Sequence, residues 1–232
     1  MDTILDDLLL DIQEGRYKEN DKLPSSNTLA EKYKVSRLKI RNVYEKLEAI
    51  GYVYSYQGRG YYLKNRNKVI NLTLGNESFS KKIKKQGLTL ENKVIFCERI
   101  PYNEDIFLKL DANKADQIYK VGRLRIVDNY PVAIHISYLS NKIFPNIYNE
   151  AHNIDSIYKY YSSKGYKDIT SDKSLLSVVM PTNLEKKYLN CGELSPLIKL
   201  ESIEKDIKKK KIIEYSVILY RGDSFKYVIE NK

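Results

Sequence analysis

Two arginines at the start of a helical pattern are spaced to act together. Arg37 and Arg41 are four residues apart, so on a helix their side chains lie on one face. Ser36, a favourable N-cap, comes just before them. Guanidinium groups near that end of a helix can enter the major groove of duplex DNA and donate to base edges. The helix itself is predicted by apolar residues at helical spacing, namely Ile40, Val43, Tyr44, Leu47 and Ile50.

A second group of polar residues is spaced to bind a small molecule. Arg123 and Arg125 are two apart in a predicted strand, so both guanidinium groups project from one face and suit a phosphate or a carboxylate. Glu214, Ser216 and Tyr220 are separated by even numbers of residues on another predicted strand, so their side chains lie on the same face. Together they offer one acceptor and two hydroxyl groups to a polyol. From the residues alone an alternative stays open, in which the arginines form surface ion pairs and Glu214 is an edge-strand charge.

The elements around Arg37 and Arg41 predict a winged helix-turn-helix. Residues 24–26 open a short helix, and residues 34–35 form the turn before the basic helix. Gly51 ends that helix as a C′ glycine does. The wing follows as two strands, residues 52–57 and 61–63, around the turn Gly58-Arg59-Gly60 with a cation at its tip.

The charge distribution supports this assignment. Residues 1–33 contain four Lys and Arg against eight Asp and Glu, whereas residues 34–68 contain nine against two. The net charge of the whole chain is +10, which favours an anionic partner but by itself does not separate DNA from RNA or a membrane surface. Because the basic residues coincide with the turn, the cap and the wing, we expect double-stranded DNA.

Composition excludes several other classes of protein. No apolar run approaches the ~20 residues that span a bilayer, and the first residues are acidic where a secretory signal is cationic. We therefore expect a cytoplasmic protein without a membrane partner. Cys97 and Cys191 are far apart, and His135 and His152 show no metal-ligand spacing. We expect free thiols, no metal and no cofactor.

The 232 residues suffice for two domains. We expect a DNA-binding domain over residues 1–66, a polar linker with a connecting strand over residues 67–76, and a second domain over residues 77–232. Its long strands joined by tight turns predict an α+β fold, a largely antiparallel sheet with helices on it. The expected helices are 79–86, 156–164 and 183–190, and the expected strands are 93–101, 117–127, 132–139, 173–180, 197–206, 212–220 and 225–229.

The first domain resembles the amino-terminal domain of GntR-type bacterial transcription regulators. The matching residues include Leu23-Pro24-Ser25, Leu29-Ala30, Val35-Ser36-Arg37, Gly51-Tyr52 and Gly58-x-Gly60. The resemblance implies DNA contacts from Arg37 and Arg41, support from Ser36 and Lys39, and approach of Gly58, Arg59 and Gly60 to the minor groove or backbone. The chain departs from the family at Ser26-Asn27, where Glu-Arg is usual, and at Lys39, where Thr is usual.

The second domain resembles the UTRA effector domain of the HutC branch, which has a chorismate-lyase-like fold. The matching pattern runs from Gly122-Arg123-Leu124-Arg125 through Ser156-Ile157-Tyr158 to Tyr220-Arg221-Gly222-Asp223. His135 stands where many relatives have Glu. Ser78-Phe79-Ser80 opens a predicted helix, whose amino-terminal end favours an anion. The resemblance implies an effector site lined by Arg123, Arg125, Ser156, Tyr158, Glu214 and Tyr220. It also implies that Ser78, Phe79 and Ser80 surround the anionic group of the effector. His135 belongs to the same expected site and is the residue at which this chain differs from those relatives.

These patterns together predict a homodimeric, ligand-responsive transcription regulator that is not an enzyme. The expected role is repression of a carbohydrate catabolic operon, with release from operator DNA when an anionic effector such as a sugar phosphate or a related metabolite binds. Two alternatives stay open, a small-molecule-processing enzyme with the same fold and a DNA-binding module whose second domain only dimerises. No nucleophile elbow, phosphate-binding loop or metal cluster supports the enzyme.

Overall fold

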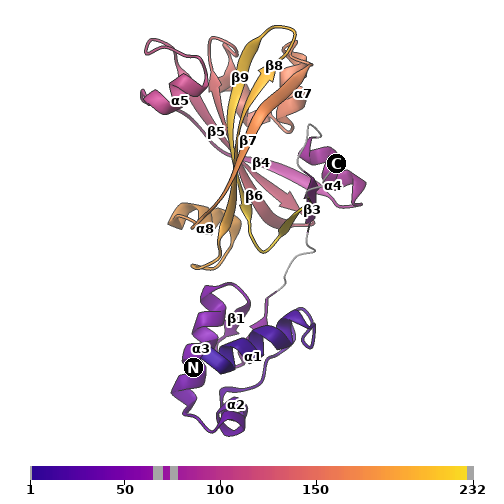
Figure 1. Cartoon of the computed structure of the whole chain (residues 1–232), viewed down its shortest axis with the longest axis vertical. Helices are drawn as coiled ribbons and strands as arrows, with labels where there is room; N and C mark the ends of the chain where they lie inside the picture. The colour runs from indigo at the N-terminus through magenta and orange to yellow at the C-terminus, as the bar shows by residue number, and fades with distance from the viewer. Residues whose placement is uncertain (1, 65–69, 74–77, 229–232) are drawn as a thin grey trace. The chain divides into compact units, whose positions relative to one another are not determined.

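The computed structural model describes residues 2–64, 70–73 and 78–228, which form two compact units (Figure 1). One unit consists of residues 1–68 with 191–195, and the other consists of residues 69–190 and 196–232. The expected connecting strand is β3 (Ile70–Thr73). Residues 67–69 and 74–76 of the predicted linker lie outside the described residues, and the exact domain boundaries stay a prediction.

The first unit contains three helices whose ends are set by short polar side chains. They are α1 (Asp2–Gln13), α2 (Ser26–Tyr33) and α3 (Arg37–Ala49). Ser25 Oγ accepts a hydrogen bond from the Thr28 backbone N at 3.1 Å, and Ser36 Oγ accepts one from the Lys39 backbone N at 3.3 Å. These N-caps start α2 and α3. Lys34 lies between the helices in the left-handed conformation with φ +52°, so the predicted turn is confirmed.

The wing and the helices share one core. Strands β1 (Val53–Tyr56) and β2 (Gly60–Leu63) pair antiparallel, with Val53 opposite Leu63. The predicted stripe of α3 is confirmed, because four of its five residues are buried and Ile50 is half-buried. Burial of this stripe against α1, α2 and β1 fixes which face of α3 remains in solvent. The buried cluster comprises Ile4, Leu8, Leu23, Leu29, Ile40, Val43, Tyr44, Leu47 and Val53.

The second unit is built on a six-stranded sheet in the order β4-β5-β6-β9-β8-β7, in which every neighbouring pair is antiparallel. A separate parallel pair joins β3 to β10 (Phe225–Val228). The α+β fold class is thus confirmed. The six strands are β4 (Leu90–Arg99), β5 (Ile118–Val127), β6 (Tyr130–Ser140), β7 (Ile169–Val179), β8 (Leu197–Asp206) and β9 (Lys211–Arg221).

Short helices precede β4 and lie between later strands (Figure 1). They are α4 (Phe79–Lys85), α5 (Glu104–Lys109), α6 (Ile147–Glu150), the 3₁₀ turn η1 (Ala151–Asn153), α7 (Ile157–Ser163) and α8 (Asn183–Leu189). Helices α4, α7 and α8 match the three expected ones. No helix was expected over α5, α6 or η1, which have six residues or fewer each, too few to show a helical period. In the part of the chain that is described, no helix has the length and apolarity needed to cross a bilayer.

One face of the sheet carries both the core and a group of buried polar residues. Along β5, Val121, Arg123, Arg125 and Val127 share this face and all four are buried. Val121 belongs to an apolar cluster with α6 and α7, and Val127 belongs to another with α4 and β3. The two arginines lie on the strand between these clusters. The fold therefore places two guanidinium groups inside the unit, between two apolar cores.

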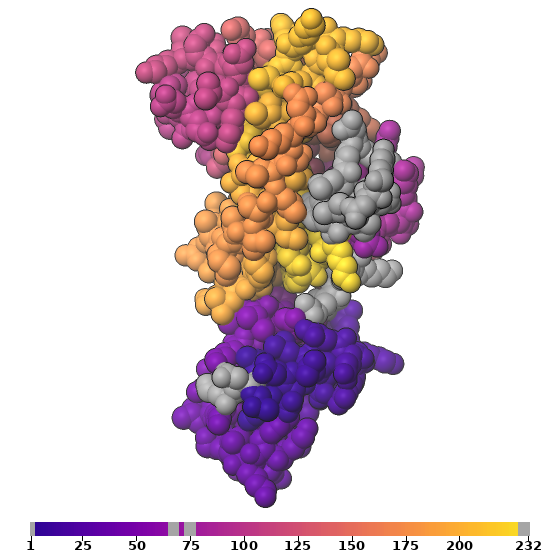
Figure 2. Space-filling view, in the orientation of Figure 1, coloured from indigo at the N-terminus to yellow at the C-terminus, as the bar shows by residue number. Residues whose placement is uncertain are grey.

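Strand β7 is an edge strand of the sheet. Its residues, orange near 170–180, run across part of the face that the space-filling view shows (Figure 2). Leu175, Leu176 and Val178 of this strand are exposed, Val178 by 72%. An apolar edge strand is a surface at which another chain can pair or pack.

Candidate DNA interface and effector site

The cations predicted to contact DNA lie on the solvent side of α3. Arg37 and Arg41 are exposed, and Lys39 is half-buried. The Ser36 hydroxyl oxygen accepts the hydrogen bond that caps α3, as expected of the residue that precedes the helix. The geometry on which a major-groove contact depends, two guanidinium groups on the open face of the helix, is therefore present. Their contact with bases stays a prediction.

The wing is joined to α3 by two stacked tyrosines. The rings of Tyr44 on α3 and Tyr61 on β2 are 4.1 Å apart between centroids and nearly parallel. The Tyr44 hydroxyl donates to the Pro24 carbonyl oxygen at 2.5 Å. Burial raises the pKa of Tyr61, and Glu45 adds to the rise, whereas the neighbouring Arg41 guanidinium lowers it. The Arg41 guanidinium is therefore near enough to the Tyr61 hydroxyl to affect its pKa.

The wing tip has the backbone that its glycines permit. Gly58 and Gly60 have φ of +73° and +105°, a region that disfavours other residues. Arg59 lies between them and is exposed, with its guanidinium 5.2 Å from the centre of the Tyr56 ring. The predicted turn with a cation at its tip is present, and its contact with DNA stays a prediction.

The predicted effector residues on the sheet come together in a buried group. Arg123 and Arg125 on β5 face His135 on β6, and each places a terminal nitrogen 2.8 Å from His135 Nδ1. Arg125 also donates to the Tyr220 hydroxyl at 3.4 Å. On the other side of the imidazole, His135 Nε2 is 3.3 Å from Glu214 Oε1. Five of the predicted residues therefore form one continuous polar group on one face of the sheet.

The protonation state of His135 follows from its neighbours. An arginine can only donate, so Nδ1 must accept and the ring proton lies on Nε2, toward Glu214. Burial first, and then the charges of Arg123 and Arg125, lower the pKa of His135 to about 3. The imidazole is therefore neutral near pH 7. The two guanidinium groups face a neutral acceptor where a Glu would supply a negative charge.

The carboxylates nearby do not neutralise both arginines. Burial by itself raises the pKa of Glu214, but His135, Ser137 and Arg123 hold it below its ordinary value, so Glu214 is ionised. The pKa of Glu204 is raised to about 7, first by burial and then by Glu214. Burial also lowers the pKa of Arg123 to about 10, which still leaves it charged at pH 7. The buried group therefore has an excess of positive charge when Glu204 is protonated.

Two fully buried atoms of this group, Arg123 Nε and Tyr161 Oη, lack a hydrogen-bond partner among the described residues. His135 Nε2 and Glu214 Oε1 have only their 3.3 Å contact with each other. Such atoms are costly unless a water or a ligand satisfies them. Donors and acceptors are both represented, so a bound molecule with hydroxyl and anionic groups would match them chemically.

The structure also positions the remaining predicted effector residues. Phe79 lies against Arg125, whose guanidinium is 4.3 Å from the centre of the ring, so this residue joins the group. Tyr158 is half-buried, and burial followed by Glu204 and Glu214 raises its pKa, which places it on the carboxylate side. Ser78 caps α4, and Ser80 is exposed on it. Ser156 caps α7 and lines a separate open hollow with Tyr160 and Lys164.

Several members of the group were not among the predicted site residues. Glu204 and Ser202 on β8 lie opposite Glu214 and Ser216 on β9. Ser202 donates to Glu204 at 2.8 Å and lies 2.9 Å from Ser216. The signal available in the sequence was the parity of Ser202 and Glu204 in a strand that forms a hairpin with the strand of Glu214. Ser137 on β6 and Tyr161 on α7 complete the group.

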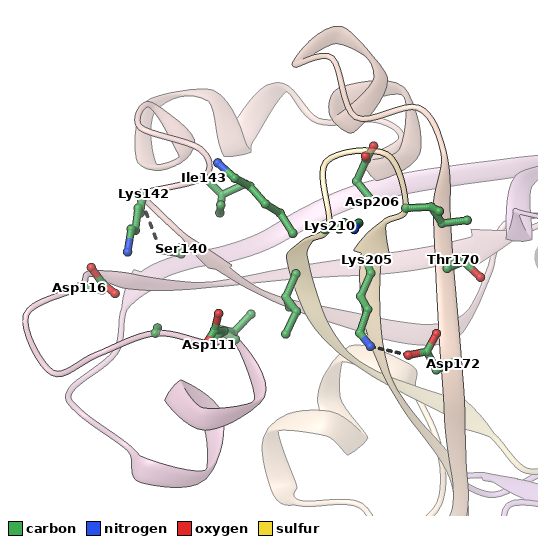
Figure 3. Close-up of a pocket in the computed structure, with 15 residues that line it drawn as sticks. Asp111, Asp116, Ser140, Lys142, Ile143, Thr170, Asp172, Lys205, Asp206 and Lys210 are labelled. Atoms are coloured by element: carbon green, nitrogen blue, oxygen red, sulfur yellow. Dashed lines mark hydrogen bonds and ion pairs between the residues drawn. The ribbon is translucent and has the colours of Figure 1, made fainter.

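A different hollow lies at the hairpin ends of the sheet unit (Figure 3). It has a volume of about 600 Å³, and an ion pair between Lys205 and Asp172 lies on its wall. Its buried polar groups are already satisfied, since Asp206 accepts from the Lys209 backbone and Ser140 from the Lys142 backbone. None of the predicted effector residues lines it. The size of this hollow alone does not make it the effector site.

Two regions of the chain match known protein families. Residues 1–63 match the family of bacterial regulatory proteins called gntR, and residues 85–226 match the UTRA domain. A probable fructoselysine utilization operon transcriptional repressor of Escherichia coli (strain K12) is 28% identical, over 99% of this chain and 93% of the relative. The mannosyl-D-glycerate transport/metabolism system repressor MngR of the same organism is 24% identical, over 97% and 93%.

Solved structures show the same fold. The crystal structure of PhnF from Mycobacterium smegmatis superimposes with a TM-score of 0.63 at 22% identity, and the match covers 97% of this chain and 98% of PhnF. The family matches, the described helix-turn-helix with its wing and the six-stranded sheet all agree. The chain therefore belongs to the GntR family of bacterial transcription regulators, in the HutC-type branch that carries a UTRA domain.

Proposed function

We propose that this chain is a cytoplasmic, homodimeric repressor of a carbohydrate catabolic operon and that an anionic small molecule releases it from operator DNA. Residues 1–66 bind the DNA, and residues 77–232 bind the effector and dimerise. The names of two relatives, which refer to fructoselysine utilization and to mannosyl-D-glycerate transport and metabolism, support a carbohydrate-linked operon.

One observation carries the choice of an anionic effector. The guanidinium groups of Arg123 and Arg125 are buried, and their common partner is the neutral imidazole of His135. Two buried positive charges are costly when Glu214 supplies only one negative charge to the group. The phosphate group of a sugar phosphate would accept hydrogen bonds from both guanidinium groups in place of the imidazole. The hydroxyl groups of the sugar would then meet Glu214, Tyr220 and the unsatisfied atoms near them.

Ligand binding tests this part of the proposal. Calorimetry with a panel of sugar phosphates and their unphosphorylated sugars should show binding of at least one phosphorylated compound and at least tenfold weaker binding of its parent sugar. Arg125→Gln should abolish the binding, whereas Arg99→Gln, which removes an exposed arginine from the edge strand β4, should leave it unchanged. Equal affinity for the sugar and its phosphate contradicts the anionic effector.

The DNA half of the proposal has a separate test. Two recognition helices related by a two-fold axis bind half-sites about one helical turn apart. Replacing Arg37 or Arg41 by Ala should cost ~1–3 kcal/mol and relax base preference if the arginine contacts guanine. Gel shifts at fixed salt with a selected duplex and a scrambled duplex measure both effects. Equal binding to the two duplexes by the unaltered protein leaves only nonspecific electrostatic attraction.

Release by the effector links the two sites. A ligand that weakens operator binding must itself be bound more weakly by the protein on DNA, by the same factor. A coupling of ~1–3 kcal/mol corresponds to roughly 5- to 150-fold. Titrating the ligand found above into the protein–DNA complex should show this reduction. Unchanged ligand affinity on DNA contradicts effector-driven release.

Exposed apolar side chains on β7 support the homodimer. Leu176 and Val178 lie on an edge strand, and Val178 is 72% exposed. Val178→Lys should shift the sedimentation coefficient toward the monomer and weaken binding to a palindromic duplex. Lys173→Ala changes an exposed residue of the same strand and should do neither. A protein that sediments as a monomer at micromolar concentration and still binds the palindrome cooperatively contradicts a preformed dimer.

A further inference from the structure

The first turn of α3 carries an apolar side chain that is exposed and is not part of the core. Leu38 is 66% exposed, although it lies between Arg37 and Lys39. At about 100° per residue, Leu38 falls on the side of the helix opposite the middle of the stripe of Ile40, Val43, Tyr44 and Leu47. It is therefore the residue of this turn that points most directly away from the core.

The position of Leu38 within the helix is equally specific. It is the second residue of α3, and helical side chains lean toward the amino-terminal end. In helix-turn-helix proteins this end of the second helix contacts base edges. Arg41, three residues further on, is a neighbour of Leu38 on the helix surface, and Arg37 precedes Leu38 in the chain; both arginines are exposed. The first turn therefore presents an apolar tip with cations beside it.

The chemistry of the tip selects its partner. A helix inserted with Arg37 and Arg41 toward the DNA brings Leu38 to the floor of the major groove, because it lies farthest from the core. The base edges there carry polar donors and acceptors together with one apolar group, the C5-methyl of thymine. An apolar protein surface fits less well, since it would also have to cover the neighbouring guanidinium groups without hydrogen-bond partners.

We infer that Leu38 contacts a thymine methyl group in each operator half-site and so helps to determine the sequence that this protein selects. The inference rests on the proposed DNA-binding function and extends it to a base. It assigns contacts with phosphate or guanine to Arg37 and Arg41, and the contact with a thymine methyl group to Leu38.

The experiment uses the full chain and removes only the methyl group. The preferred duplex is first selected from a randomised pool, and each thymine of a half-site is then replaced by deoxyuridine. One position per half-site should weaken binding about fourfold, the equivalent of ~0.8 kcal/mol for one buried methyl-sized group at ~1.4 kcal/mol per tenfold. The other thymines should be insensitive.

Variants separate Leu38 from other sources of the effect. Leu38→Ala should bind the thymine duplex more weakly and should bind the thymine and deoxyuridine duplexes equally. Its thermal unfolding temperature should change little, because Leu38 is 66% exposed and lies outside the buried cluster. Leu10→Ala removes another exposed leucine, 53% exposed on α1, and should retain the full sensitivity to deoxyuridine.

Each contrary outcome has a distinct meaning. A selected duplex in which no thymine is sensitive to deoxyuridine overturns the methyl contact while the DNA-binding function stands. A Leu38→Ala protein that keeps the wild-type sensitivity also overturns the assignment to Leu38. Failure to enrich any sequence from the pool overturns the proposed function and the inference with it.

Discussion

The carboxyl groups of Glu204 and Glu214 belong to directly opposed residues of β8 and β9, and both residues are buried. Only Glu214 has compensating neighbours, since His135, Ser137 and Arg123 hold its pKa below the ordinary value despite burial. Glu204 has Ser202 as its hydrogen-bond donor and Glu214 as a repelling charge. Two identical side chains on adjacent strands therefore prefer opposite protonation states.

The first prediction is a pH-dependent loss of stability caused by Glu204. Its pKa is about 7 in the folded protein, against an ordinary value of 4.5, so the folded state binds the extra proton between these two values. Stability therefore falls as pH rises from about 4.5 to 7 and is level above that range. At ~1.4 kcal/mol per pKa unit, the full loss is on the order of 3 kcal/mol.

Glu204→Gln should remove this contribution. The variant should be more stable than the unaltered protein at pH 8 and nearly equal to it at pH 5, as measured by urea unfolding across that range. Glu91→Gln, which changes an exposed glutamate on β4, provides the comparison, because an exposed carboxylate should contribute little. A Glu204→Gln protein that is no more stable at pH 8 would show that Glu204 ionises without cost.

The second prediction concerns the neutral partner of the two arginines. His135→Glu places a carboxylate where both guanidinium groups donate at 2.8 Å. An internal anion would then compete with the effector, so the affinity for a sugar phosphate should fall at least tenfold. His135→Gln retains a neutral acceptor and should bind more tightly than His135→Glu. Calorimetry with the same ligand measures both, and tighter binding by the Glu variant would contradict an anion at this site.

The third prediction tests a close approach beside Arg123. A side-chain carbon added at Gly122 on β5 would lie 2.2 Å from the ring of Phe96 on the adjacent strand. Gly122→Ala should therefore destabilise the protein by ~1–3 kcal/mol through overpacking. Gly87→Ala has open space around the new carbon, but its φ of +70° adds strain. The matched comparison is instead Gly122→Ala in a Phe96→Leu background.

In that background the added carbon meets a smaller side chain, so much of the loss should be recovered. Urea unfolding of the two single variants and the double variant gives the coupling free energy. Additive losses would show that the Phe96 ring does not cause the strain at Gly122.

The DNA-binding unit was predictable because its signals are local. Ser36 as N-cap, the apolar stripe of α3 and Gly51 lie within sixteen residues of one another, and each acts through neighbours in sequence. The exposure of Arg37 and Arg41 follows directly from the stripe. The stack of Tyr61 on Tyr44 did not follow, because it depends on how the wing folds back on the helix.

The effector group was predictable only in part. The alternation of side chains along a strand predicted that Arg123 shares a face with Arg125 and that Glu214 shares a face with Tyr220. It did not show that His135 lies between these two pairs. That arrangement requires β6 to lie between β5 and β9, although β9 is over seventy residues away in the chain. Glu204 was not predicted as a site residue. A bulge between Glu204 and Lys205 shifts the register of β8 against β9, so the pairing of Glu204 with Glu214 does not follow from counting back from the turn. Distant pairing and bulges are set by the whole sheet.

The last prediction separates the two functions of the stacked tyrosines. Tyr61→Phe keeps the ring on Tyr44 and removes only the hydroxyl group beside Arg41. Because Arg41 then loses a neighbour that orients it, binding to the selected duplex should weaken roughly two- to fivefold with little change in stability. Tyr44→Phe instead removes the donor to the Pro24 carbonyl and should cost ~1 kcal/mol of folding free energy. Gel shifts and urea unfolding on both variants give the comparison. If Tyr61→Phe lowers stability as much as Tyr44→Phe while leaving DNA affinity intact, the wing tyrosine supports the fold and does not position Arg41.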